Sequence, residues 1–158
     1  MVLGILLNSN SVTLNLSDRR ELDNYKYQGG DNGISYKYFH SPLAELVASI
    51  LPLSLAPNII TFVAAMCLVI PHVATLMVYG RAFDGPVNDW AALTVGICHM
   101  IYITLDNVDG KQARRTGSSS PLGQMFDHGC DAITFNIAVI TMCRYMQLSS
   151  TYYAFGIV

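Results

Sequence analysis

Two pairs of aspartates are the residues of this sequence best suited to chemistry. Asp106 and Asp109 are three residues apart, and Asp127 and Asp131 are four apart, so each pair falls on one face of a helix. The segment between the pairs, Thr116 to Pro121, is rich in Ser and Gly and predicts a connector that lets them face each other. Carboxylates gathered in this way repel one another unless cations lie between them. The spacing therefore predicts a cation site.

The ligand type indicates which cation and which reaction. Carboxylate oxygens suit Mg²⁺ or Mn²⁺, and two such ions clamp the attacking and leaving oxygens of a phosphoryl group. Gly110 and Gly123 allow a close approach, Arg114 offers a planar fork to phosphate, and Lys111 and Arg115 add positive charge. Each feature alone is more typical of a helix cap, a loop or a membrane-topology signal, so the prediction depends on their combination.

Other functional classes lack their residues. The region of Asp106 is not an EF-hand, because Val108 occupies a ligand position. No G-x-x-x-x-G-K-[ST] phosphate loop is present, and the cysteine spacing offers no zinc site. The net charge of -2 provides no basic surface, so we expect no nucleic-acid partner.

The hydrophobic composition indicates a membrane protein. Hydrophobic residues make up 52% of the sequence and charged residues 13%, against about 25% charged in an average soluble domain. No charged residue lies between Glu45 and Arg81, which predicts a first span over Ile59–Gly80. The second and third apolar runs, 90–105 and 132–143, reach spanning length only by taking a pair of aspartates into each helix.

We therefore expect an all-α, polytopic membrane helical bundle with about three transmembrane spans and the start of a fourth. Residues 1–40 form a cytosolic N-terminal segment, residues 41–56 an interfacial amphipathic helix, and residues 57–158 the catalytic domain. Lys and Arg residues occur before the first span and in the 111–122 loop, which predicts that both of these segments lie in the cytosol. The site then faces the cytosol, and the lipid bilayer is a partner.

The segment from Asp106 to Asp131 resembles the signature of the CDP-alcohol phosphotransferase family, D-x2-D-G-x2-A-R-x8-G-x3-D-x3-D. Every fixed position is present: Asp106, Asp109, Gly110, Ala113, Arg114, Gly123, Asp127 and Asp131. Further stretches are similar to the eukaryotic choline/ethanolamine phosphotransferase branch, namely Lys111–Thr116, Ser119–Gly123, Phe126–Asp131, Ser41–Leu43 and Ala56–Thr61.

The resemblance implies the reaction and the substrates. Phosphocholine or phosphoethanolamine would pass from CDP-choline or CDP-ethanolamine to diacylglycerol, releasing CMP, in phospholipid biosynthesis. The aspartates of the signature would hold two divalent cations, Mg²⁺ or Mn²⁺. Gly110, Ala113, Arg114 and Gly123 would line the nucleotide and phosphate pocket, and Asn58 is a further candidate for contact with the nucleotide. The branch also implies the endoplasmic reticulum or Golgi as location.

Two residues compete for the role of general base. Asp131 is the usual proposal for the wider family, whereas His128 is typical of this branch and has a suitable side chain. The branch carries a glutamate just after the second glycine of the signature, where this sequence has Gln124. A pairing of the histidine with a carboxylate at that position is therefore absent.

Length and head group leave alternatives open. Members of the branch are typically more than twice as long, with later helices that shape the acceptor cavity and carry homodimer contacts. We therefore expect this chain to hold the metal and nucleotide signature without a complete acceptor pocket. The alternatives are another CDP-alcohol phosphatidyltransferase, for phosphatidylinositol or phosphatidylglycerophosphate, and a truncated non-catalytic membrane subunit. The signature does not separate choline from ethanolamine.

Overall fold

The computed structural model describes residues 33–80 and 86–147 and, before them, Asn15, Ser17, Arg20, Glu21 and Asn24. The chain divides into two units, Met1–Gly30 and Asp31–Val158. In the first unit the amide of Asn24 donates a hydrogen bond to the carbonyl of Arg20 at 3.0 Å. Most of the predicted N-terminal segment, and most of the predicted fourth span, lie outside the described residues.

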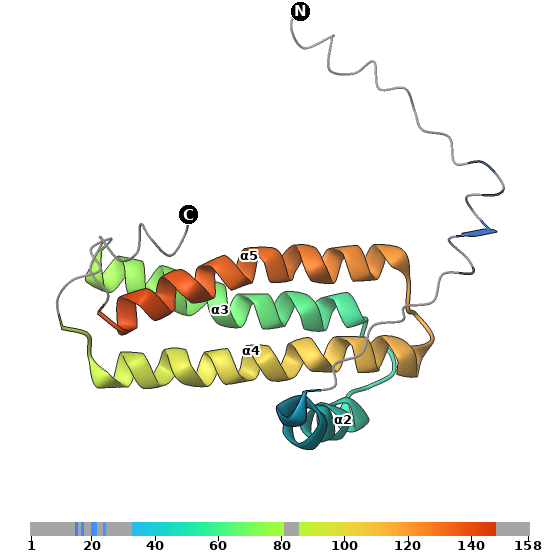
Figure 1. Ribbon diagram of the computed structural model, residues 1–158, viewed down its shortest axis with the longest axis horizontal. Helices are drawn as coiled ribbons and strands as arrows, with labels where there is room; N and C mark the ends of the chain where they lie inside the picture. Colours follow the sequence, from blue (N-terminus) through green and yellow to red (C-terminus); the bar gives the residue numbers. More distant parts are fainter. Residues whose placement is uncertain are drawn as a thin grey trace, which may run out of the picture. The chain divides into compact units, whose positions relative to one another are not determined.

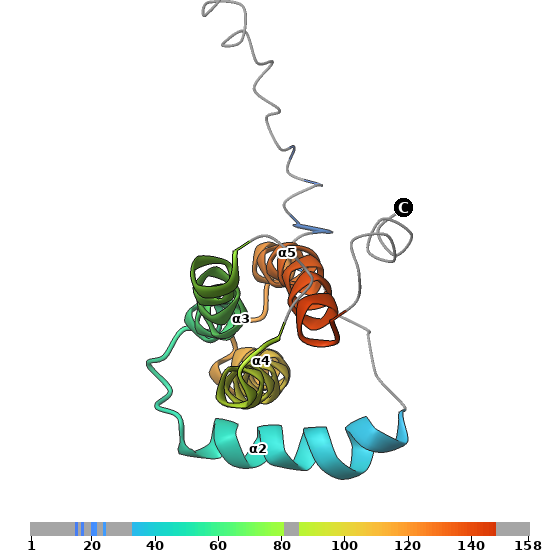
Figure 2. The same cartoon turned by 90° about the vertical axis from the view of Figure 1, so that its left-hand side faces the viewer.

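The second unit is helical throughout its regular elements. A π-helical turn, η1 (Tyr36–His40), leads into α2 (Ser41–Ile50), and three long helices follow: α3 (Pro57–Tyr79), α4 (Asp89–Thr116) and α5 (Pro121–Tyr145). No strand occurs among the residues that the structure describes. The three long helices run side by side, and α2 lies crosswise against α4, as the two views together show (Figures 1 and 2). The predicted all-α fold is confirmed.

The connector between α4 and α5 is fixed by short-range backbone chemistry. Gly117 ends α4 in the left-handed conformation, with φ 66°, which a residue with a side chain adopts only with strain. The amide of Ser118 donates to the carbonyl of Ala113, closing the helix end. The hydroxyl of Ser120 then accepts from the amide of Gly123 at 3.1 Å and caps α5. These signals turn the chain within a few residues, so the two helices return side by side.

The predicted interfacial segment, residues 41–56, is helical only over Ser41–Ile50. Leu51 is extended, with ψ 143°, because the following Pro52 disfavours the helical conformation at the residue before it. Ala44 and Ala48 of α2 are buried in a cluster with Ile60 of α3 and Val108 of α4. These alanines are one turn apart, and their small side chains let α2 lie close to α4.

Two of the described helices, α3 and α4, are long and apolar enough to cross a membrane by length and composition. They contain the first two predicted spans, and α4 continues without a break through both aspartates of its pair, as predicted. The third predicted span lies in α5, which has 25 residues. That α5 also crosses a membrane stays a prediction.

The bundle buries polar side chains and exposes apolar ones. His72 and Thr75 of α3 form hydrogen bonds with α5, the imidazole Nδ1 to the hydroxyl of Thr141 at 2.7 Å and the hydroxyl of Thr75 to Tyr145 Oη at 2.9 Å. The large side chains that are more than half exposed on the long helices include Phe62, Ile70, Met77, Leu93, Ile97 and Phe135. Polar contacts between helices and an apolar outer surface are typical of helices that pack in lipid.

Candidate metal and nucleotide site

The structure brings the two aspartate pairs together across α4 and α5. Asp109 is 5% exposed, and Asp106, Asp127 and Asp131 are half-buried. The negative charges of Asp131, Asp109 and Asp127 all act on Asp106, and those of Asp127 and Asp131 act on Asp109. Ligand atoms of Asp127, His128 and Asp131 lie within 4.8 Å of one another. The result is a compact group of carboxylates with a histidine at its edge.

Hydroxyl groups from neighbouring helices hold two of these carboxylates. Thr61 of α3 donates a hydrogen bond to Asp109 Oδ2. Tyr102 Oη, on α4, donates to Asp131 Oδ1 at 3.0 Å, and the hydroxyl of Thr134 donates to Tyr102 Oη at 3.1 Å.

The sequence prediction missed all three hydroxyl residues. Tyr102 lies one helical turn before Asp106, and Thr134 lies three residues after Asp131, so each shares a helix face with a predicted ligand. Thr61 lies in the Ala56–Thr61 stretch that resembles the family. Their partners across helices are not readable from spacing.

The environment of one carboxylate oxygen shows whether a cation fits the site. Asp127 Oδ1 is buried and has no hydrogen-bond partner among the described residues. A buried carboxylate oxygen without a partner is costly, and a divalent cation would supply the missing interaction. The surrounding ligand atoms are mainly hard carboxylate oxygens, which suit Mg²⁺ or Mn²⁺. The residues present therefore fit the predicted cation.

Asn58 and Gly123 lie together at the start of α3 and α5. Asn58 is in the first turn of α3 and is exposed. A Cβ atom added at Gly123 would lie 3.2 Å from Ser120 Oγ and 3.5 Å from Asn58 Oδ1. The glycine thus allows the close approach of these two helix starts. At Gly110 a Cβ would lie at an ordinary 3.6 Å from the Arg114 guanidinium, so packing alone does not require glycine there.

The remaining predicted residues lie near the aspartates along α4 and α5. Ala113 is half-buried on α4, and Arg114 is exposed. His128 is exposed on α5, with its Nε2 3.3 Å from the Nε2 atom of Gln124 one turn earlier. The histidine therefore contacts the side-chain amide of Gln124.

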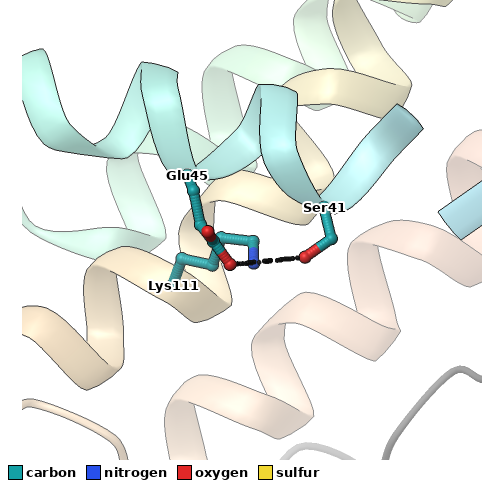
Figure 3. A network of polar contacts seen from close by, with 3 residues as sticks. All are labelled: Ser41, Glu45 and Lys111. Carbon is teal, nitrogen blue, oxygen red and sulfur yellow. Dashed lines mark hydrogen bonds and ion pairs between the residues drawn. The ribbon is translucent and has the colours of Figure 1, made fainter. Parts of the chain in front are cut away.

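The structure places Lys111 and Arg115 against α2. Lys111 Nζ donates to Glu45 Oε1 and to Ser41 Oγ, both at 2.9 Å, so it joins α4 to α2 (Figure 3). The hydrogen bond and charge of Lys111 lower the pKa of Glu45, which favours the ionised carboxylate. Arg115 donates to the carbonyl of Leu51 at 2.7 Å, beyond the end of α2. Both cations therefore contact α2 and the segment that follows it, and their service to a phosphate stays a prediction.

Gln112 completes this junction and was not predicted. Its side chain is fully buried, and its Nε2 donates to the carbonyls of Pro52 at 2.9 Å and Leu55 at 3.2 Å. Carbonyls at and beyond a helix end lack partners from the helix itself. Gln112 and Arg115 supply those donors, so the segment that carries the aspartates also fixes α2.

Replacing Gln112 by alanine is expected to loosen α2. The change removes the donor to the carbonyl of Leu55 and leaves the carbonyl of Pro52 with the amide of Leu55 alone. A lost donor to a buried carbonyl costs about 1–3 kcal/mol, which corresponds to about 5- to 150-fold faster opening. Hydrogen exchange of the α2 amides in nanodiscs measures this directly. Glu45→Gln is the control, because its exposed ion pair contributes less. Equal exchange rates in the two variants would show that Gln112 does not hold α2.

Comparison with known proteins agrees with this geometry. Residues 54–158 match the family model described as CDP-alcohol phosphatidyltransferase. The chain is 43% identical over 112 residues to choline/ethanolaminephosphotransferase 1 of Arabidopsis thaliana, covering 71% of the chain and 28% of the relative. It is 38% identical over 135 residues to human ethanolaminephosphotransferase 1, covering 82% of the chain and 34% of the relative.

A third relative extends the similarity to fungi. Cholinephosphotransferase 1 of Saccharomyces cerevisiae is 35% identical over 128 residues, covering 81% of the chain and 32% of the relative. The chain spans about a third of the length of the curated relatives that it matches. The matched region contains every aspartate of the site and extends through the three long helices. The chain therefore belongs to the CDP-alcohol phosphatidyltransferase family.

Proposed function

We propose that this chain transfers phosphocholine or phosphoethanolamine from a CDP-alcohol to diacylglycerol, releasing CMP. The observation that carries the proposal is the group of carboxylates between α4 and α5, with a buried Asp127 oxygen that has no hydrogen-bond partner among the described residues. The family and the names of its choline and ethanolamine relatives support the substrate class. The reaction belongs to phospholipid biosynthesis.

The proposed chemistry assigns a role to each group of residues. The aspartates of the two pairs hold two divalent cations, which when bound neutralise the charge of the substrate pyrophosphate. Arg114 is exposed at this end of α4 and offers its guanidinium to a phosphate oxygen. Gly110, Ala113, Gly123 and Asn58 line the nucleotide side of the site.

The transfer step exchanges one phosphorus–oxygen bond for another. The diacylglycerol hydroxyl oxygen attacks the β-phosphorus of the CDP-alcohol, and the bond from this phosphorus to the bridging oxygen breaks. CMP leaves with that oxygen and the electron pair. The hydroxyl proton passes to His128 or Asp131, which lie on the same face of α5 beside the carboxylate group.

The lipid acceptor implies a position in the membrane. We infer that α3 and α4 cross the bilayer, with α5 as the third span, and that α2 lies in the interface, because α2 runs crosswise to them. The lysines and arginines near α2 and in the last turns of α4 favour the cytosolic side for this end. The endoplasmic reticulum or Golgi is the membrane that this orientation and substrate class suit.

The test is CMP release by the chain in membranes of cells that lack the endogenous activity. CDP-choline or CDP-ethanolamine, diacylglycerol and Mg²⁺ are supplied, and EDTA removes the cation in the control. We expect turnover that EDTA abolishes, and the faster donor identifies the head group. Turnover with inositol or glycerol phosphate and CDP-diacylglycerol instead would assign another reaction of the family. Cation-dependent binding of CDP-choline without turnover would indicate a non-catalytic subunit.

A further inference from the structure

Tyr102 and Thr134 form a chain of hydrogen bonds that ends on Asp131. Tyr102 Oη donates to Asp131 Oδ1 at 3.0 Å, and the hydroxyl of Thr134 donates to Tyr102 Oη at 3.1 Å. Tyr102 is half-buried on α4, and Thr134 is 1% exposed on α5. We propose that Tyr102 is a positioning residue, which holds the Asp131 carboxylate in the orientation that binds a divalent cation. This inference rests on the cation site of the proposed function.

The packing of the helices explains why this carboxylate needs such a residue. α3 packs against both α4 and α5, whereas α4 and α5 approach each other closely at few described positions. Asp131 therefore faces α4 across an interface that backbone packing does not fix. The Tyr102 side chain bridges this interface, because it reaches the neighbouring helix and has only two rotatable side-chain torsions before its rigid ring.

The chemistry of the contact favours an orienting role. A hydroxyl that donates to an ionised carboxylate forms a charge-assisted bond, which is stronger and more directional than a neutral one. The bond engages Oδ1 and so fixes the plane of the carboxylate and the direction of Oδ2. Partners of this kind behind metal ligands commonly change metal affinity by about 10- to 100-fold when they are removed.

Thr134 supports Tyr102 more weakly. Its hydroxyl has one proton, which the carbonyl of Cys130 at 2.9 Å also attracts. The loss of Thr134 leaves the bond from Tyr102 to Asp131 in place, because Tyr102 donates the proton of that bond. We expect Thr134→Val to weaken cation binding by about two- to tenfold, in line with the loss of one neutral hydrogen bond.

Binding of Mn²⁺ tests the inference without relying on turnover. The full chain in nanodiscs is titrated with Mn²⁺, and the free ion is measured by its electron paramagnetic resonance signal. Tyr102→Phe keeps the ring and removes only the hydroxyl, and we expect about 10- to 100-fold weaker binding. In an Asp131→Asn background the same change should have no further effect, because Tyr102 acts through that carboxylate.

Tyr145→Phe is the matched control. Tyr145 Oη also hydrogen-bonds a threonine of another helix, Thr75 of α3, at 2.9 Å, and it lies far along α5 from Asp131. Because Tyr145 does not contact the aspartates, we expect the Mn²⁺ affinity of Tyr145→Phe to equal that of the wild type. If the Tyr102 hydroxyl were also purely structural, Tyr102→Phe would leave the Mn²⁺ affinity unchanged too.

Each outcome decides between distinct claims. Equal Mn²⁺ affinity in Tyr102→Phe and Tyr145→Phe, with the wild type binding normally, would overturn the positioning role alone. No Mn²⁺ binding by the wild type would overturn the cation site and the inference together. If Tyr102→Phe also lowers the helix content seen by circular dichroism, Thr134→Val decides: an affinity equal to the wild type would overturn the inference, and a weaker affinity supports it.

Discussion

Replacing Asp131 by asparagine is expected to lower CMP release by at least about a thousandfold. Asparagine has the same shape and its Oδ1 still accepts the hydrogen bond from Tyr102, so the helix interface is preserved. It has no negative charge to bind a cation and cannot accept the proton of the lipid hydroxyl. The variant therefore removes the chemistry of this position while leaving its packing intact.

The stability of this variant should not fall with its activity. Asp131 repels Asp106, Asp109 and Asp127, so a neutral residue relieves repulsion in the cation-free protein. Thermal unfolding in the presence of EDTA should therefore occur at the same or a higher temperature than in the wild type. Asp89→Asn, at the opposite end of α4, removes the same charge and should leave CMP release unchanged. Undiminished release by the Asp131 variant would refute the assignment of this carboxylate to the site.

Replacing His128 by alanine is expected to slow CMP release by about 10²- to 10⁴-fold, the usual contribution of a general base. The imidazole is exposed, and its ring nitrogen lies within 4.8 Å of ligand oxygens of Asp127 and Asp131. From this position it can accept a proton from a group bound beside the cations. The same closeness would also allow the imidazole to bind a cation directly.

Mn²⁺ binding separates these two roles of His128. If the histidine is the base, His128→Ala loses turnover and keeps Mn²⁺ affinity close to that of the wild type. If it is a ligand, both fall together. His40→Ala, before α2, controls for the loss of an imidazole elsewhere and should change neither quantity. Normal turnover by the His128 variant would leave Asp131 as the base.

The basic residues after Asp109 show what spacing along one helix leaves open. Lys111, Arg114 and Arg115 are nearly consecutive, and the sequence predicted that all three serve a phosphate. On a helix, such neighbours point in different directions. Lys111 and Arg115 are four residues apart and share the face that α2 covers, so both bind α2. Arg114 lies on another face and stays exposed, so the proposed function assigns contact with a phosphate to Arg114.

The long helices and the family were predictable because their signals are local. The uncharged runs predicted the regions of α3, α4 and α5, and Gly117, Ser120 and Pro121 marked the turn between the last two. The predicted helix over residues 41–56 extended too far, because α2 ends at Ile50, before Pro52. The family signature consists of residue types at fixed spacings, so it too could be read along one chain.

By itself, the sequence determined the helical class, the two aspartate pairs and the family, because each is a pattern of residue types and spacings along the chain. Only the tertiary structure decided which hydroxyls hold the carboxylates, since Thr61 and Tyr102 bind aspartates on other helices. It also decided that Gln112 is buried and binds two carbonyls of the segment that follows α2. The physical reason is that such hydrogen bonds depend on how helices are rotated against each other. That rotation is set by packing over the whole bundle, and spacing along one helix does not contain it.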